Sequence, residues 1–104
     1  MKPYVIIRRG GWRSEAEVAH AAARSAAVGD EQMPHEVRWL RSYILDEGDG
    51  LLGTICVYEA TGPEALRRHA LLAGLPVDEI MPVAETVVVR PDPVSVPVPV
   101  PVAA

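Results

Sequence analysis

Cysteine is nearly absent from this chain of 104 residues, whose single thiol is Cys56. A lone cysteine cannot form an internal disulfide, so the sequence fits a reducing compartment, and we expect a cytoplasmic protein. No apolar run approaches the roughly 20 residues that cross a bilayer. The N-terminal stretch "KPYVIIRR" also lacks the long apolar segment and cleavage site of a signal peptide. We therefore expect no membrane partner.

Positive charge is also scarce. Ten lysine and arginine residues are outnumbered by fourteen aspartate and glutamate residues, which gives a formal net charge of −4. The basic residues are scattered along the chain, whereas binding to nucleic-acid phosphates needs a concentrated positive surface. Nucleic acid is therefore a poor candidate partner.

Compact catalytic motifs are missing as well. His20, His35 and His69 do not occur in an HxH or HExxH spacing, and no serine, histidine and acid form a recognisable triad. Gly10-Gly11 and Gly48-Asp49-Gly50 are typical of turns, since neither lies in a phosphate-binding motif. A chain of this length has room for one modest core. Whether the protein is an enzyme stays open.

What the sequence does contain is an alternation of strand and helix patterns. We expect strands at residues 2–8, 36–47, 51–60 and 78–91, and helices at residues 15–28 and 63–73. The order β-α-β-β-α-β is that of ferredoxin-like α+β folds, which lay two helices on one face of a four-stranded antiparallel sheet. We assign residues 1–90 to this domain. The proline- and valine-rich tail, residues 91–104, is either disordered or an extended arm that adds to a partner's sheet.

Helix boundaries are marked by specific residues. Ser14 and Glu17 form a capping-box pattern before the first helix, and Thr61 and Glu64 form a second pattern before the other. Gly74 follows the second helix and is a natural C-terminal stop. These signals predict where each helix begins and ends.

Alternation along the strands predicts which side chains share a face. A small aliphatic set suits packing under the helices: Leu40, Ile44, Ile55 and Val57. The remaining set, rich in aromatic and polar side chains, is then placed on the bare face: Trp39, Arg41, Tyr43, Cys56 and Tyr58. A sheet face that no helix covers is expected to pack against another protein surface. We therefore predict a homodimer whose facing sheets enclose a ligand pocket lined by Trp39, Arg41, Tyr43 and Tyr58.

Cys56 and His69 are candidate soft donors for a transition metal such as zinc, nickel or copper. The alternative for Cys56 is an inert buried thiol, because a reactive one needs electropositive or metal surroundings. The alternative for His69 is a partly buried, hydrogen-bonded histidine at the edge of a helical core stripe. The predicted faces put the two residues on opposite sides of the sheet, so only a dimer or a sheet edge would join them.

A family resemblance adds to these patterns. The stretches "VRWLRSYI", "CVYEA" and "EALRRHALLAGLPVDEIMPVAETVV" resemble the small bacterial family DUF4242, related to an actinobacterial nickel-responsive protein, over most of residues 3–90. The resemblance implies a ferredoxin-like fold that dimerises through its sheets and binds a divalent metal, with nickel as the metal. It maps Cys56 and His69 onto the family's cysteine and helix histidine. Arg41 stands where many relatives have histidine, and arginine cannot ligate a metal because it stays protonated.

Three hypotheses follow from the residues and the resemblance. The first is a dimeric, nickel-responsive type of divalent-metal-binding protein that uses Cys56 and histidine. The second is a dimeric α/β barrel that binds or transforms a small ligand, with Arg41 as the polar anchor of an aromatic-lined pocket. The third is an interaction protein whose tail, residues 91–104, adds to another sheet.

Overall fold

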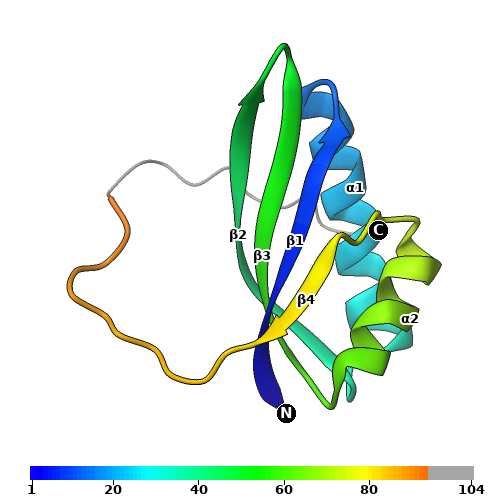
Figure 1. The fold of residues 1–104 in the computed structure, drawn as a ribbon. Coiled ribbons are helices and arrows are strands. Elements are labelled where there is room, and N and C mark those ends of the chain that lie inside the picture. The colour runs from blue at the N-terminus through cyan, green and yellow to red at the C-terminus, as the bar shows by residue number, and fades with distance from the viewer. Residues whose placement is uncertain (94–104) are drawn as a thin grey trace.

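The computed structural model describes residues 1–93 and confirms the predicted order of strands and helices (Figure 1). The elements are β1 (Lys2–Trp12), α1 (Glu15–Ala27), β2 (Val37–Gly48), β3 (Leu51–Ala60), α2 (Pro63–Ala73) and β4 (Glu79–Pro82), with a π-helical turn η1 (Val28–Gln32) after α1. All strand pairs are antiparallel, in the order β2-β3-β1-β4. Both helices cover the same face of the sheet. The fold is a ferredoxin-like α+β fold. None of its described helices is long and apolar enough to cross a membrane.

The helix ends show which sequence signals act. Ser14 Oγ accepts a hydrogen bond from the Glu17 backbone N–H at 3.1 Å, so the first cap is confirmed. The second capping box is wrong, because α2 starts after Gly62 and has no side-chain cap. Its Glu64 pairs instead with Arg67. Gly74 ends α2 in the left-handed conformation, at φ 67° and ψ 41°, as a glycine stop requires.

Strands β2 and β3 form the predicted hairpin, with Asp49 and Gly50 at its tip. Both tip residues have positive φ, 54° and 76°, which matches the tight hairpin turns that asparagine, aspartate and glycine favour. A register irregularity lies between Trp39 and Arg41, where Leu40 is the extra residue of β2. Because strand side chains alternate, one extra residue moves everything after it to the other face.

The structure shows that the predicted faces are wrong for most of β3. Cys56 and Tyr58 are buried on the face that the helices cover, whereas Ile55 and Val57 are only half-buried on the open face. Trp39 pairs with Tyr58 and stacks on it, so it also lies on the helix face. The sequence rule assigned the small aliphatic residues to the helices. The structure instead buries the aromatic side chains under the helices, since large rings bury more apolar area than branched side chains do.

The core consists of two apolar clusters under the helices. The larger is built around Ile6, Tyr58 and Leu66, and the smaller contains Trp12, Val18 and Ala21. Between them, β1 contributes Arg8 and β3 contributes Thr54, both buried. Ser25 of α1 and His69 of α2 are buried on the same side. We call Arg8, Ser25, Thr54, Tyr58 and His69 the polar layer.

The last strand is shorter than predicted. Strand β4 ends at Pro82 rather than continuing to residue 91, and Val83 N–H donates to Pro3 O at 3.0 Å as the final bond to β1. The reason is that β1 itself begins at Lys2, so the strand has no partner beyond this point. The following segment leaves the sheet on the side away from the helices (Figure 1). Of the predicted tail, residues 94–104 lie outside the described residues.

Candidate functional site

Cys56 and His69 lie on the same side of the sheet, not on opposite sides as the predicted faces implied. Cys56 is 5% exposed and His69 is 0% exposed. The Cys56 thiol donates to Thr54 Oγ1 at a sulfur–oxygen distance of 3.5 Å. Both candidate donors are therefore interior groups of the same chain.

His69 is held in one orientation by α1. Its Nε2 lies 3.0 Å from the Ser25 carbonyl oxygen. A carbonyl oxygen can only accept, so Nε2 carries the proton and Nδ1 is left as an acceptor. Nδ1 is buried and has no hydrogen-bond partner within residues 1–93. Burial lowers the pKa of His69 below its ordinary value, the bond to Ser25 opposes that shift, and the nearby Arg8 cation adds to it.

Tyr58 joins the two helices to the sheet. Its hydroxyl lies 2.6 Å from Ser25 Oγ, and its ring stacks on Trp39 with centroids 6.0 Å apart. The His69 ring packs against the same tyrosine at 5.4 Å with a 60° tilt. Burial raises the pKa of Tyr58 to about 12, and the hydrogen bond to Ser25 and the Arg8 cation offset part of that rise. Tyr58 is therefore a neutral hydroxyl at physiological pH.

Arg8 is the group that sequence reasoning missed. It is only 2% exposed, and both of its terminal nitrogens, Nη1 and Nη2, lack a hydrogen-bond partner in the described part of the chain. No ion pair among those residues includes Arg8. The strand pattern "YVIIRR" could have identified it, because alternation from Tyr4 and Ile6 places Arg8 on the buried face.

Cys56 and the polar layer do not fit a divalent cation. Across residues 1–93, no three histidine, cysteine, aspartate or glutamate side chains form a group that could hold a metal ion. Cys56 and His69 supply two soft donors, but the neighbouring charge is the Arg8 guanidinium rather than a carboxylate. A cation repels a metal ion in a low-dielectric interior. His20 and His35, in contrast, are exposed.

The four predicted pocket residues are divided between the two faces. Trp39 and Tyr58 pack under the helices, whereas Arg41 and Tyr43 project from the open face beside Val57 and Ile55. The extra residue in β2, Leu40, is the cause of the division. On the open face, Arg41 Nη1 lies 3.1 Å from an Asp92 carboxylate oxygen, and the Tyr43 hydroxyl donates to the same carboxylate at 2.9 Å. Within the described chain these four residues do not line a common pocket.

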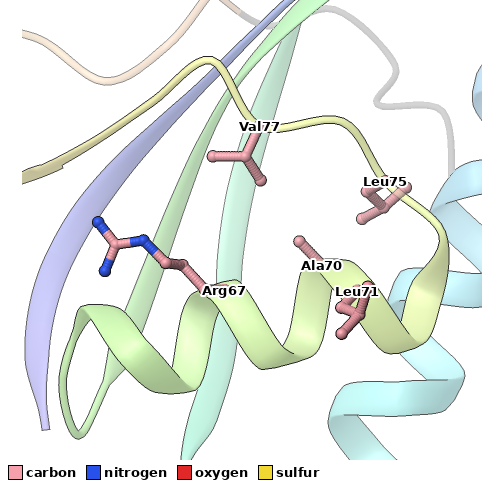
Figure 2. A pocket seen from close by; sticks show the side chains of 5 residues that line it. All are labelled: Arg67, Ala70, Leu71, Leu75 and Val77. Carbon is pink, nitrogen blue, oxygen red and sulfur yellow. The ribbon is translucent and has the colours of Figure 1, made fainter.

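A groove lies on the outer side of the molecule, between α2 and the chain that follows it (Figure 2). It has a volume of about 320 Å³, and its walls are mostly aliphatic with one cation at the rim: Arg67, Ala70, Leu71, Leu75 and Val77. The groove is shallow, and the described residues that line it include no nucleophile or acid.

Comparison with known proteins identifies the family. The family described as "Nickel responsive protein SCO4226-like" matches residues 4–83. A similar solved structure is that of SCO4226 from Streptomyces coelicolor A3(2), at 22% identity and a TM-score of 0.67, covering 82% of this chain and 99% of that chain. No curated protein matches the sequence. The expected relation to a nickel-responsive protein is thus confirmed at the level of the family, while the DUF4242 label stays a prediction. The chain belongs to the SCO4226-like family of nickel-responsive proteins.

Proposed function

We propose that this protein is a homodimeric member of the nickel-responsive family, in which the open faces of two sheets cover each other. The observation that carries the proposal is the composition of the open face. Both helices lie on the other side of the sheet (Figure 1), so this face presents branched aliphatic side chains to its surroundings. They come from the central strands β1 and β3: Val5, Ile7, Ile55 and Val57.

The edges of this face extend the apolar surface. Leu45 of β2 and Met81 of β4 are 36% and 47% exposed, and they flank the central aliphatic residues on either side. A contiguous apolar patch on a small protein is a favoured protein–protein contact, because its burial removes apolar area from water. A second copy of the chain presents the same patch, as a two-fold symmetric interface requires.

We further propose that the dimer binds divalent nickel through exposed imidazoles rather than through Cys56 and His69. The family description supports nickel as the metal. His20 on α1 and His35 before β2 are exposed, and neutral imidazole is a good nickel ligand. Cys56 and His69 are both buried, and the Arg8 cation near His69 disfavours a metal ion there.

Replacing Ile55 with glutamate is expected to convert the dimer to a monomer. Ile55 lies in the central part of the open face, opposite Ile7 and Tyr43 in the ladders, and an unpaired carboxylate buried between two sheets would cost several kcal/mol. Size-exclusion chromatography with light scattering measures the mass. The matched control is Leu71→Glu, which adds the same charge on the opposite side of the molecule, where Leu71 is 81% exposed. A wild-type monomer at micromolar concentration would contradict the proposed dimer.

Native mass spectrometry of untagged protein, before and after addition of nickel chloride, tests the metal proposal. We expect stoichiometric nickel on the wild-type protein, loss of nickel from a His20→Ala/His35→Ala double variant, and unchanged uptake by Cys56→Ser. Loss of nickel from Cys56→Ser, with uptake retained by the double variant, would contradict the exposed site and support the ligands that the sequence predicted. No uptake by the wild-type protein would contradict both.

A further inference from the structure

The strongest unexplained feature of the interior is the buried Arg8 guanidinium, which has no ion-pair partner among residues 1–93. A guanidinium stays protonated in proteins, and an isolated charge in an apolar medium is heavily penalised. Buried polar groups without a partner are few in native proteins, and an unseen ion or water is a common reason. Here neither Arg8 Nη atom makes a hydrogen bond of good geometry within the described residues, and the neighbouring Tyr58 hydroxyl is neutral, so it does not balance the charge.

We propose that the polar layer is a binding site for a small carboxylate-like anion, held by Arg8. The two Nη atoms of an arginine form a fixed fork that matches the two oxygens of a planar carboxylate. One such anion would neutralise the charge and satisfy both nitrogens. The inference stands apart from the proposed dimer and nickel site, which use the open face and exposed imidazoles.

The surroundings of Arg8 are chemically suited to an anion. The layer borders the two apolar clusters, and its groups other than Arg8 are neutral: two hydroxyls on Ser25 and Thr54, the phenol of Tyr58, and an imidazole whose pKa is lowered. No carboxylate competes for the arginine among the ion pairs of residues 1–93. Attraction between Arg8 and an anion would therefore act in a low-dielectric setting, where it is strong.

The same layer contains a second buried polar atom without a hydrogen-bond partner within residues 1–93. His69 Nδ1 is buried and unpartnered, and as the unprotonated nitrogen it accepts a hydrogen bond. Arg8 lies near enough to affect the pKa values of both His69 and Tyr58. A carboxylate that enters with one water, or that carries a hydroxyl, would supply a hydrogen to Nδ1 as well as oxygens to Arg8. The layer thus offers two donors and one acceptor to a single small ligand.

Thermal unfolding in sodium formate tests the inference, with sodium chloride at equal ionic strength as the reference salt. We expect formate to raise the Tm of the wild-type protein saturably, on the order of 5–10 °C, because a ligand that binds only the folded state stabilises it. Arg8→Met should lose this response. In formate-free buffer the same variant should unfold at or above the wild-type Tm, because it replaces a buried unpaired charge with an apolar side chain of similar length.

Three outcomes would overturn the inference. An equal response of wild type and Arg8→Met would place formate elsewhere, and an equal, saturable response to chloride would exclude a carboxylate class. If Arg8→Met does not fold, formate titration of the wild-type protein by amide NMR decides the question. Shifts are expected at Ser25, Tyr58 and His69 and not at Leu71 or Leu72, which are exposed on α2. Unchanged amides throughout the polar layer would refute the site.

Discussion

Replacing Leu66 with alanine is expected to lower the free energy of unfolding by about 2–5 kcal/mol, because it removes a buried branched side chain and leaves a cavity. Leu66 is 0% exposed and belongs to the larger core cluster, where it faces the sheet from α2. For a domain of this size, each kcal/mol lowers Tm by about 4–8 °C. Chemical denaturation followed by circular dichroism measures the change.

Leu71→Ala is the matched control on the same helix. It deletes the same atoms from a side chain that is mostly in solvent, so the free energy of unfolding should stay within about 0.5 kcal/mol of wild type. The comparison removes any effect of helix propensity, since both changes put alanine into α2. Similar losses for Leu66→Ala and Leu71→Ala would show that α2 does not pack on the sheet as described.

Gly53→Ala is expected to destabilise the protein by about 1–3 kcal/mol, although it adds a single methyl group. A Cβ atom at Gly53 would lie 2.7 Å from the Arg8 carbonyl oxygen, which belongs to the neighbouring strand and cannot move freely. It would also overlap the Glu47 carboxylate, which crosses over Gly53 to accept hydrogen bonds from Gly10 N–H and Arg9 Nε. The hairpin or its bond to β1 must shift to make room.

Gly29→Ala provides the contrast for this prediction. The added methyl would meet Val37 at 3.6 Å and His69 at 3.7 Å, which are ordinary contacts, and Gly29 lies in a helical turn where alanine is preferred. Its stability should be unchanged or higher by up to about 1 kcal/mol. Combining Gly53→Ala with Glu47→Ala should recover part of the loss, because only the carbonyl contact remains. A Gly53→Ala protein as stable as Gly29→Ala would contradict the described packing of β3 against β1.

The order of elements was predictable because each one carries its own local signal. Ser14 caps α1, Gly74 stops α2, and Asp49-Gly50 closes the hairpin, and each signal depends on residues a few positions apart. Where the prediction was wrong, the deciding interaction came from a distant part of the chain. The length of β4 was overestimated because the start of β1 sets it, and nothing in the β4 sequence reports that limit.

Distant parts of the chain also decide which face of the sheet each candidate site residue occupies. Simple alternation places Trp39 and Arg41 on the same face of the sheet. The register irregularity at Leu40 instead moves Arg41 to the open face, while Trp39 stays on the helix face. Cys56 and Tyr58 are buried under the helices, where the Tyr58 hydroxyl also finds Ser25 on α1, a partner 33 positions away. Cys56 and His69 therefore share the helix-covered side of the sheet within one chain. Their use as metal ligands stays a prediction that the nickel titration tests.

The amino-acid sequence by itself determined the ferredoxin-like order, the helix and hairpin boundaries, and the family, because these depend on local backbone preferences and on short motifs. Only the tertiary structure decided which face each strand side chain occupies and that Arg8 lies beside Tyr58 and His69, with no ion-pair partner in the part of the chain that the structure describes. The physical reason is that burial is a property of the whole packed chain. A side chain's environment is set by partners from other elements, and those contacts form only when the sheet and helices come together.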